Sequence, residues 1–114
     1  MEDDLFKLAD TLTSAIKNSK CYNDYLISKE RIKKDSKLCD KIREFKSLHI
    51  DLQKKKLNNE EISFDYERDI SKRYYNLILN EDVKTFLENE QILIKLMGDI
   101  YNRISTECVL DFDL

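Results

Sequence analysis

The last third of the chain, residues 80–108, is the feature that most limits the folds available to this sequence. It contains no proline and only one glycine, Gly98. Apolar residues recur there at spacings of three and four positions, which predicts one long amphipathic helix. At 1.5 Å per residue, this helix would be roughly 40 Å long. We therefore expect the preceding segments to pack against it.

The predicted helix has a wider apolar face than the seam of a two-stranded coiled coil. With Val83 at heptad position a, this position also carries Met97, Ile104 and the charged Glu90. Positions d and e carry Phe86, Leu93, Ile100, Leu87, Ile94, Tyr101 and Cys108. A charge at Glu90 must be paired or must face a cavity. We interpret Glu90 either as an ion-paired or edge residue, or as a polar position that fixes helix register or partner choice.

Short polar residues predict where the helices begin and end. Asn80, Asp35 and Ser19 can act as N-caps, because their side-chain oxygens accept free N–H groups of a first helical turn. Asn58 and Asn59 suit a helix end, since Asn tolerates the left-handed conformation found there. These signals and the apolar spacing predict helices over about residues 3–18, 20–34, 36–57, 64–79 and 80–108, with residues 58–63 as the clearest loop. The second helix either continues the first after a bend or starts a new rod.

Each of the four earlier helices carries an apolar stripe that we assign to the core. The stripes comprise Leu5, Leu8, Ala9, Leu12, Ala15 and Ile16; then Tyr22, Tyr25, Leu26 and Ile32; then Leu38, Ile42, Phe45, Leu48 or His49, and Leu52; and finally Ile70, Tyr74, Leu77 and Ile78. Short connections imply antiparallel neighbours. The prediction is an all-α, antiparallel helical bundle of four to five helices with a long C-terminal helix.

Composition supports this fold class and excludes several functions. A chain of 114 residues is one domain by length, and residues 109–114 lack a periodic pattern, so we expect them to fray. Its 41% hydrophobic and 38% charged residues are typical of a helical bundle. The absence of proline and the single glycine argue against β-hairpins, phosphate-binding loops and dinucleotide-binding motifs, because these need glycine.

Charge is distributed unevenly along the chain. Residues 29–56 hold 11 basic and 5 acidic side chains, net +6, whereas residues 57–114 hold 6 basic and 13 acidic ones, net −7. The basic segment could face the acidic half of its own bundle, an acidic partner or nucleic acid. Direct RNA binding by residues 29–56 is therefore an alternative function. It is weakened because Phe45 is the only aromatic residue there that could stack on a base.

Three cysteines, Cys21, Cys39 and Cys108, lie far apart without a CxxC spacing. This pattern argues against a disulfide framework and suggests a reducing compartment. We interpret them as small apolar residues, with a metal or cluster shared between chains as the alternative. The acidic start of the sequence lacks the apolar core of a secretory signal, and no apolar run is long enough for a membrane span. We expect a cytoplasmic location.

Nothing in the sequence assembles a catalytic site. His49 is the only histidine, so a His-based relay or metal site would have no second histidine. The many carboxylates show no spacing that selects a catalytic pair. We predict a protein without enzymatic activity.

Several short motifs occur in an order that resembles a known family. Ala15, Ile16, Lys17, Ser19 and Tyr22 form one motif. Asp35 with Leu38, and Ile42 with Phe45, form the next two. The longest comprises Asn80, Val83, Phe86, Leu87, Glu90, Leu93, Leu96, Met97, Ile100 and Ile104. Across about residues 5 to 105 the chain resembles the YlbF/YmcA family of bacterial competence and biofilm regulators and the related YheA proteins.

The resemblance implies an all-α regulatory protein that works by association. Family members associate with related helical subunits and with a third protein, YaaT, in an assembly linked to RNase Y-dependent mRNA processing, competence, sporulation and biofilm formation. Iron–sulfur clusters are associated with that assembly, but this chain lacks a cysteine-rich tail, so we assign it no cofactor and no metal. The expected partners are another copy or related helical subunits, with a YaaT-like protein and RNase Y as further candidates, and no membrane.

We place the partner-binding surface on the long C-terminal helix. The candidate residues are Phe86, Leu87, Glu90, Leu93, Ile94, Met97, Ile100 and Tyr101. Some must serve the internal core and others the partner, and the pattern alone does not separate them.

Overall fold

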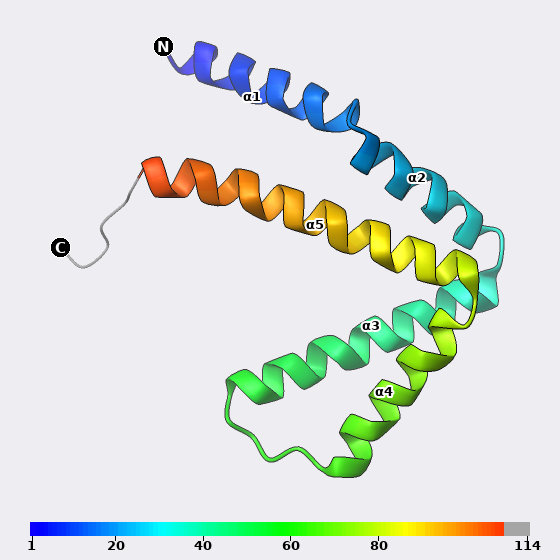
Figure 1. The fold of residues 1–114 in the computed structure, drawn as a ribbon. Helices are drawn as coiled ribbons and strands as arrows, with labels where there is room; N and C mark the ends of the chain where they lie inside the picture. Colours follow the sequence, from blue (N-terminus) through cyan, green and yellow to red (C-terminus); the bar gives the residue numbers. More distant parts are fainter. Residues whose placement is uncertain (109–114) are drawn as a thin grey trace. The chain divides into compact units, whose positions relative to one another are not determined.

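The computed structural model describes residues 1–108, and within this range the chain forms five α-helices and no strand (Figure 1). They are α1 (Glu2–Lys17), α2 (Lys20–Lys33), α3 (Ser36–Leu57), α4 (Phe64–Ile78) and α5 (Glu81–Glu107). The predicted all-α bundle with a long C-terminal helix is confirmed, and the helix ends agree with prediction to within a few residues. The frayed tail predicted for residues 109–114 lies outside the described residues.

Four short polar side chains fix the starts of α2, α3, α4 and α5. Ser19, Asp35, Ser63 and Asn80 each accept a hydrogen bond from the backbone N–H three residues later, at 3.1–3.2 Å. These bonds satisfy N–H groups that the first turn of a helix leaves free. Three of the four caps were predicted from the sequence, and Ser63 was not.

The end of α3 follows the predicted chemistry. Lys54, Lys55 and Lys56 lie in its last turn, where cations interact favourably with the negative end of the helix dipole. Asn59 adopts a φ of 54°, the left-handed conformation expected for an asparagine at a helix end. The chain then turns through residues 58–63 into α4, as the sequence predicts.

The chain divides into two compact units. One, here called the hairpin unit, is Ser28–Phe86 and contains α3 and α4. The other, here called the arm unit, combines Met1–Ile27 with Leu87–Leu114. Helices α2 and α5 contribute to both units. The single domain inferred from the length of the chain stays a prediction.

The hairpin unit has a packed core between antiparallel helices α3 and α4 (Figure 1). All the buried apolar residues of the described chain belong to this unit: Ile32, Ile42, Leu52, Ile70, Leu77, Val83 and Phe86. Ion pairs join the two helices at the surface, between Lys56 and Glu67 at 3.1 Å and between Arg73 and Glu44 at 2.8 Å. The hairpin unit is therefore a small core closed within one chain.

The arm unit differs, because its helix α1 contains no buried residue. The stripe assigned to the core from the sequence is exposed: Leu5 and Leu8 each expose 66% of their surface, and Leu12 exposes 38%. Asn89 Nδ2 donates a 3.3 Å hydrogen bond to the carbonyl of Asp24, which joins α5 to α2. Beyond this junction no helix of the arm unit covers α1, so the prediction that its stripe packs inside the chain is wrong.

Candidate protein–protein interface

The apolar face of α5 passes from buried to exposed along the helix. Val83 is fully buried and Phe86 exposes 5% of its surface. One and two turns later, Leu87 and Leu93 are half-buried. Near the end of the helix, Tyr101 exposes 69%. One continuous stripe therefore begins as core and ends as uncovered surface.

This gradient separates the residues predicted to bind a partner. Phe86 belongs to the core of the hairpin unit, where Lys46 Nζ lies 5.2 Å from the centroid of its ring. Four residues are half-buried: Leu87, Glu90, Leu93 and Ile100. Three are exposed: Ile94, Met97 and Tyr101. The division into core and surface, which the pattern left open, is now explicit, and partner binding itself stays a prediction.

Sequence reasoning missed the second half of this surface, which lies on α1. Leu5, Leu8 and Leu12 are exposed by 38–66%. Their spacing was visible in the sequence, but the same spacing was read as a core stripe. Periodicity reports which side of a helix is apolar, not which chain covers it.

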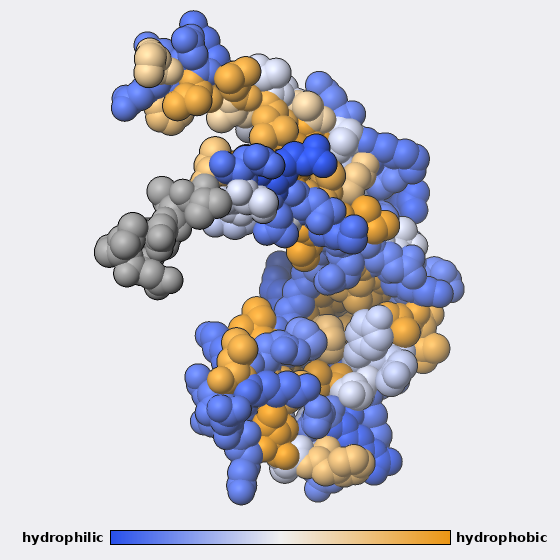
Figure 2. Space-filling view, turned by 60° about the vertical axis from the view of Figure 1, so that its left-hand side comes forward, coloured by the Kyte–Doolittle hydropathy of each residue, from blue (hydrophilic) through white to orange (hydrophobic). Residues whose placement is uncertain are grey.

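The exposed apolar residues of the two arms define a surface that we call the arm face. It comprises Leu5, Leu8, Leu12, Ile94, Met97, Tyr101 and Ile104. Figure 2 shows hydrophobic side chains exposed along the N-terminal arm, with hydrophilic residues at its tip. Single exposed apolar residues are ordinary, but contiguous stripes of this kind mark interaction surfaces.

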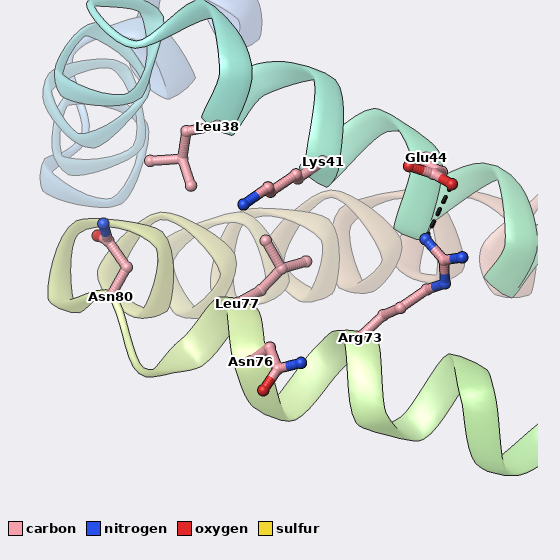
Figure 3. A pocket seen from close by; sticks show the side chains of 7 residues that line it. All are labelled: Leu38, Lys41, Glu44, Arg73, Asn76, Leu77 and Asn80. Atoms are coloured by element: carbon pink, nitrogen blue, oxygen red, sulfur yellow. Dashed lines mark hydrogen bonds and ion pairs between the residues drawn. The ribbon is translucent and has the colours of Figure 1, made fainter.

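The hairpin unit contains a shallow groove between α3 and α4 with a volume of about 440 Å³. Figure 3 shows its lining residues, with Arg73 bonded to Glu44 at one end and Lys41 and Asn76 facing the groove. The hydrogen bond that Arg73 Nε donates to Asp69 is the main reason that the pKa of Arg73 is raised, followed by the negative charges of Asp69 and Glu44. The lining includes no nucleophile with an adjacent base, so the groove offers no evident catalytic chemistry.

A second cluster of polar contacts also joins α3 to α4. Tyr66 donates a hydrogen bond from Oη to Asp51 Oδ2, and Lys55 Nζ lies 3.3 Å from the same oxygen. The Tyr66 hydrogen bond is the main reason that the pKa of Asp51 is lowered, followed by that of Lys55. The same bond raises the pKa of Tyr66. All three groups are at the surface, so we assign them a structural role.

The basic segment 29–56 is partly neutralised within its own unit. Lys56 forms an ion pair with Glu67 and Lys55 forms one with Asp51. Arg43 forms a third, with Asp40, at 3.2 Å. A shallow groove of about 470 Å³ on α3 is still lined by several cations: its residues are Arg43, Lys46, Ser47, Ile50, Asp51 and Lys54. Pairing inside the bundle therefore accounts for some of the basic side chains and leaves this part of α3 basic.

The cysteines and the histidine do not form a site in the part of the chain that the structure describes. Cys21 and Cys39 are half-buried, Cys108 is exposed, and Cys39 Sγ donates a 3.3 Å hydrogen bond to the carbonyl of Ile32. His49 is exposed, with its ring 5.8 Å from that of Phe45. No three His, Cys, Asp or Glu side chains within residues 1–108 are grouped so as to hold a metal ion.

The helices of residues 1–108 also lack a membrane-spanning candidate, since none combines sufficient length with sufficient apolar character. The fold and the arm face together define a small all-α protein whose apolar helices are covered only in part.

The chain belongs to the family described as control of competence regulator ComK, YlbF/YmcA, whose model matches residues 5–107. The resemblance inferred from the sequence motifs is thereby confirmed.

Relatives of similar length support this assignment. A UPF0342 protein from Caldicellulosiruptor saccharolyticus is 30% identical over 105 residues, which cover 92% of this chain and 87% of the relative. A UPF0342 protein from Caldicellulosiruptor bescii is 31% identical over 84% of this chain and 81% of its own length. One from Halothermothrix orenii is 32% identical over the same shares. The search of solved structures found no match.

Proposed function

We propose that this protein is a non-enzymatic regulatory adaptor that acts by helix-mediated association with another helical subunit. The observation that carries the proposal is the arm face, the apolar stripes of α1 and of the C-terminal half of α5 that residues 1–108 leave exposed. Membership of a family described as controlling a competence regulator fits a regulatory role.

The hydrophobic effect supplies enough free energy for such an association. Covering a half-exposed Leu, Ile or Met side chain contributes roughly 1 kcal/mol, since complete burial contributes about 1.5–3 kcal/mol. The seven residues of the arm face thus contribute roughly 7 kcal/mol, and a matching apolar partner adds a comparable amount. The cost of joining two molecules is about 4–15 kcal/mol. A partner with a complementary apolar face can therefore bind stably.

The regulated process follows from the family rather than from the geometry. We propose that the adaptor works in the cytoplasm in an assembly with related helical subunits, a YaaT-like protein and RNase Y. Through that assembly it would influence competence, sporulation and biofilm formation. The candidate contact residues on α5 are those that the structure leaves exposed, Ile94, Met97 and Tyr101, together with half-buried Leu93 and Ile100.

Affinity capture from the native cell tests this proposal. The tagged wild-type chain should capture helical subunits, and Met97→Glu should lose most of that capture, because a charge would be buried in an apolar contact. Tyr75→Glu, on the exposed surface of α4, is the matched control and should capture as the wild type does. Equal capture by all three proteins would contradict the proposal.

The second candidate is RNA binding by the basic segment 29–56. The observation in its favour is the groove on α3, which Arg43, Lys46 and Lys54 help to line. It predicts binding of single-stranded RNA that weakens steeply with salt. Binding should also fall when Lys33, Lys34, Arg43, Lys54, Lys55 and Lys56 are neutralised. A lack of RNA binding at low salt would reject this candidate.

A further inference from the structure

We propose that the hairpin unit binds single-stranded RNA on a row of aromatic rings from α3 and α4 that is flanked by cations. This row, here called the aromatic platform, consists of Phe45, His49, Tyr74 and Tyr75. The inference rests on the second candidate function, RNA binding, and adds the bases to the phosphates as groups that the protein contacts. It does not depend on the arm face.

The rings of the aromatic platform form one continuous surface. The ring centroid of Phe45 lies 5.8 Å from that of His49 and 5.7 Å from that of Tyr74. The ring centroid of Tyr74 lies in turn 5.7 Å from that of Tyr75, with the two rings edge to face. All four residues belong to the hairpin unit. The ring contacts therefore connect α3 to α4 within a single compact unit.

Three of the four rings are open to solvent. Tyr75 exposes 64% of its surface, Tyr74 exposes 40%, and His49 is exposed, whereas Phe45 is half-buried. Unpaired bases stack on exposed aromatic rings, and this stacking depends little on the identity of the base. The basic segment 29–56 contains Phe45 as its only phenylalanine, tyrosine or tryptophan, and the fold brings two tyrosines of α4 beside it. The structure thus supplies the stacking residues that the basic segment lacks.

Cations flank the aromatic platform on both helices. On α3, Lys46 lies one turn before His49 and also lines the basic groove of that helix. On α4, exposed Lys72 lies one turn before Tyr75. Side chains three residues apart are neighbours on a helix surface, so the basic groove, the rings and Lys72 follow one another across the hairpin unit. A single strand along this path places its bases on the rings and its phosphates beside the cations.

The net charges of the two units favour the hairpin unit as the site for a polyanion. Residues 28–86 hold 15 basic and 12 acidic side chains, net +3, whereas the remaining residues hold 5 basic and 11 acidic ones, net −6. A polyanion is therefore attracted to the hairpin unit and repelled by the arm unit. Flat rings between cations match the alternation of bases and phosphates in a single strand better than they match the aliphatic side chains of an acidic helix.

The first experiment titrates the full chain into a labelled oligouridine of about 10 nucleotides at low salt and follows fluorescence anisotropy. Tyr75→Ala should weaken binding at least fivefold, because a base loses its stacking partner, while Tyr75→Phe keeps the ring and should bind as the wild type does. Tyr101→Ala removes a similarly exposed tyrosine from the arm unit and should change nothing. Circular dichroism should show that all variants keep their helices. RNA binding that Tyr75→Ala leaves unchanged would overturn the aromatic platform.

The second experiment separates stacking from charge. Lys72→Gln should make the slope of log K against log salt concentration shallower by about 0.7, the value for one phosphate contact with a single strand. Lys7→Gln on α1 is the matched control and should leave the slope unchanged. Tyr75→Ala should not affect binding of an RNA duplex, because paired bases are not free to stack. Equal weakening for duplex and single strand would overturn the proposal, and so would binding of a polyglutamate peptide without binding of RNA.

Capture of helical subunits distinguishes this inference from the adaptor function. Tyr75→Ala should lose RNA binding and keep capture, whereas Met97→Glu should lose capture and keep RNA binding. A wild-type chain that binds no RNA at low salt would overturn the aromatic platform together with the second candidate function, and the adaptor function would stand. RNA binding by a chain that captures no helical subunit would support the platform and remove the adaptor function.

Discussion

The hairpin unit and the arm unit are built from the same kind of amphipathic helix, yet only one of them has a core. Helices α3 and α4 bury Ile42, Leu52, Ile70 and Leu77 against each other, whereas α1 buries nothing. The difference arises from connectivity. A short loop, residues 58–63, folds α4 back on α3, whereas no other helix of residues 1–108 packs along α1. The comparison teaches that an apolar stripe specifies a contact without specifying which molecule provides it.

The largest effect on the free energy of unfolding should come from shortening a side chain in the core of the hairpin unit. Ile70 exposes 3% of its surface, and Ile70→Ala should lower the free energy of unfolding by about 2–4 kcal/mol because it leaves a cavity. Ile94→Ala on the arm face, where Ile94 is 56% exposed, should change it by no more than about 0.5 kcal/mol in dilute solution. Urea denaturation measures both. Similar losses for the two variants would remove the distinction between the units.

A charge placed on α1 should affect association according to the side of the helix that carries it. Leu8→Glu puts a carboxylate into the arm face and should weaken binding of a helical partner at least tenfold, about 1.4 kcal/mol or more. Lys7→Glu changes the charge by more but lies on the opposite side of α1, so it should have little effect. The amount of helical subunit that each tagged variant captures from the native cell distinguishes the two. If Lys7→Glu weakened association as much as Leu8→Glu, net charge rather than the arm face would control it.

Removing a helix cap should have a moderate effect. Asn80 accepts a 3.2 Å hydrogen bond from the N–H of Val83, and Asn80→Ala should lower the free energy of unfolding by about 1 kcal/mol. Asn76→Ala, four residues earlier on the exposed side of α4, removes the same kind of side chain without removing a cap and should be nearly neutral. Urea midpoints compare the two. Equal midpoints would show that the cap contributes nothing measurable to α5.

The smallest effect should come from the surface contacts of Asp51. Its pKa is lowered from 3.8, mainly by the hydrogen bond from Tyr66. A carboxylate with a lowered pKa contributes stability above its unfolded-state pKa, and this contribution is lost as the pH falls through the folded-state value. Tyr66→Phe should therefore raise the titration midpoint of Asp51 towards 3.8, as followed by NMR of its carboxyl carbon. An unchanged midpoint would mean that Tyr66 is not its main partner in solution.

The local features of this fold could be predicted because their causes lie within a few residues. Asp35 and Asn80 cap helices by accepting hydrogen bonds from N–H groups three positions away. Asn59 adopts its left-handed conformation just after α3, whose last turn contains three lysines. The cap at Ser63 was missed, although Ser63 directly precedes α4 and ends the polar loop that was recognised. Local chemistry therefore predicts where helices start and stop.

The coverage of each helix could not be predicted in the same way. The stripe with Leu5 and Leu8 has the same spacing as the stripe with Ile42 and Leu52, but the first is exposed and the second contributes to a core. On α5, Phe86 was a candidate contact residue and is instead core, while Tyr101 is exposed. Which of two equivalent stripes is covered depends on long-range packing, and the hydrophobic pattern of a single helix carries no information about it.

The lack of any buried residue in α1 has a consequence for how assembly could be controlled. Most helical stability in proteins comes from packing, so a helix of 16 residues without it exchanges readily with unfolded chain. In a free chain, the amides of α1 should exchange with solvent hydrogen much faster than those of α4. If its order arises only on association, the fraction of ordered α1 follows the concentration of the helical partner. The abundance of that partner would then act as the signal, and its synthesis and degradation would decide when α1 becomes ordered.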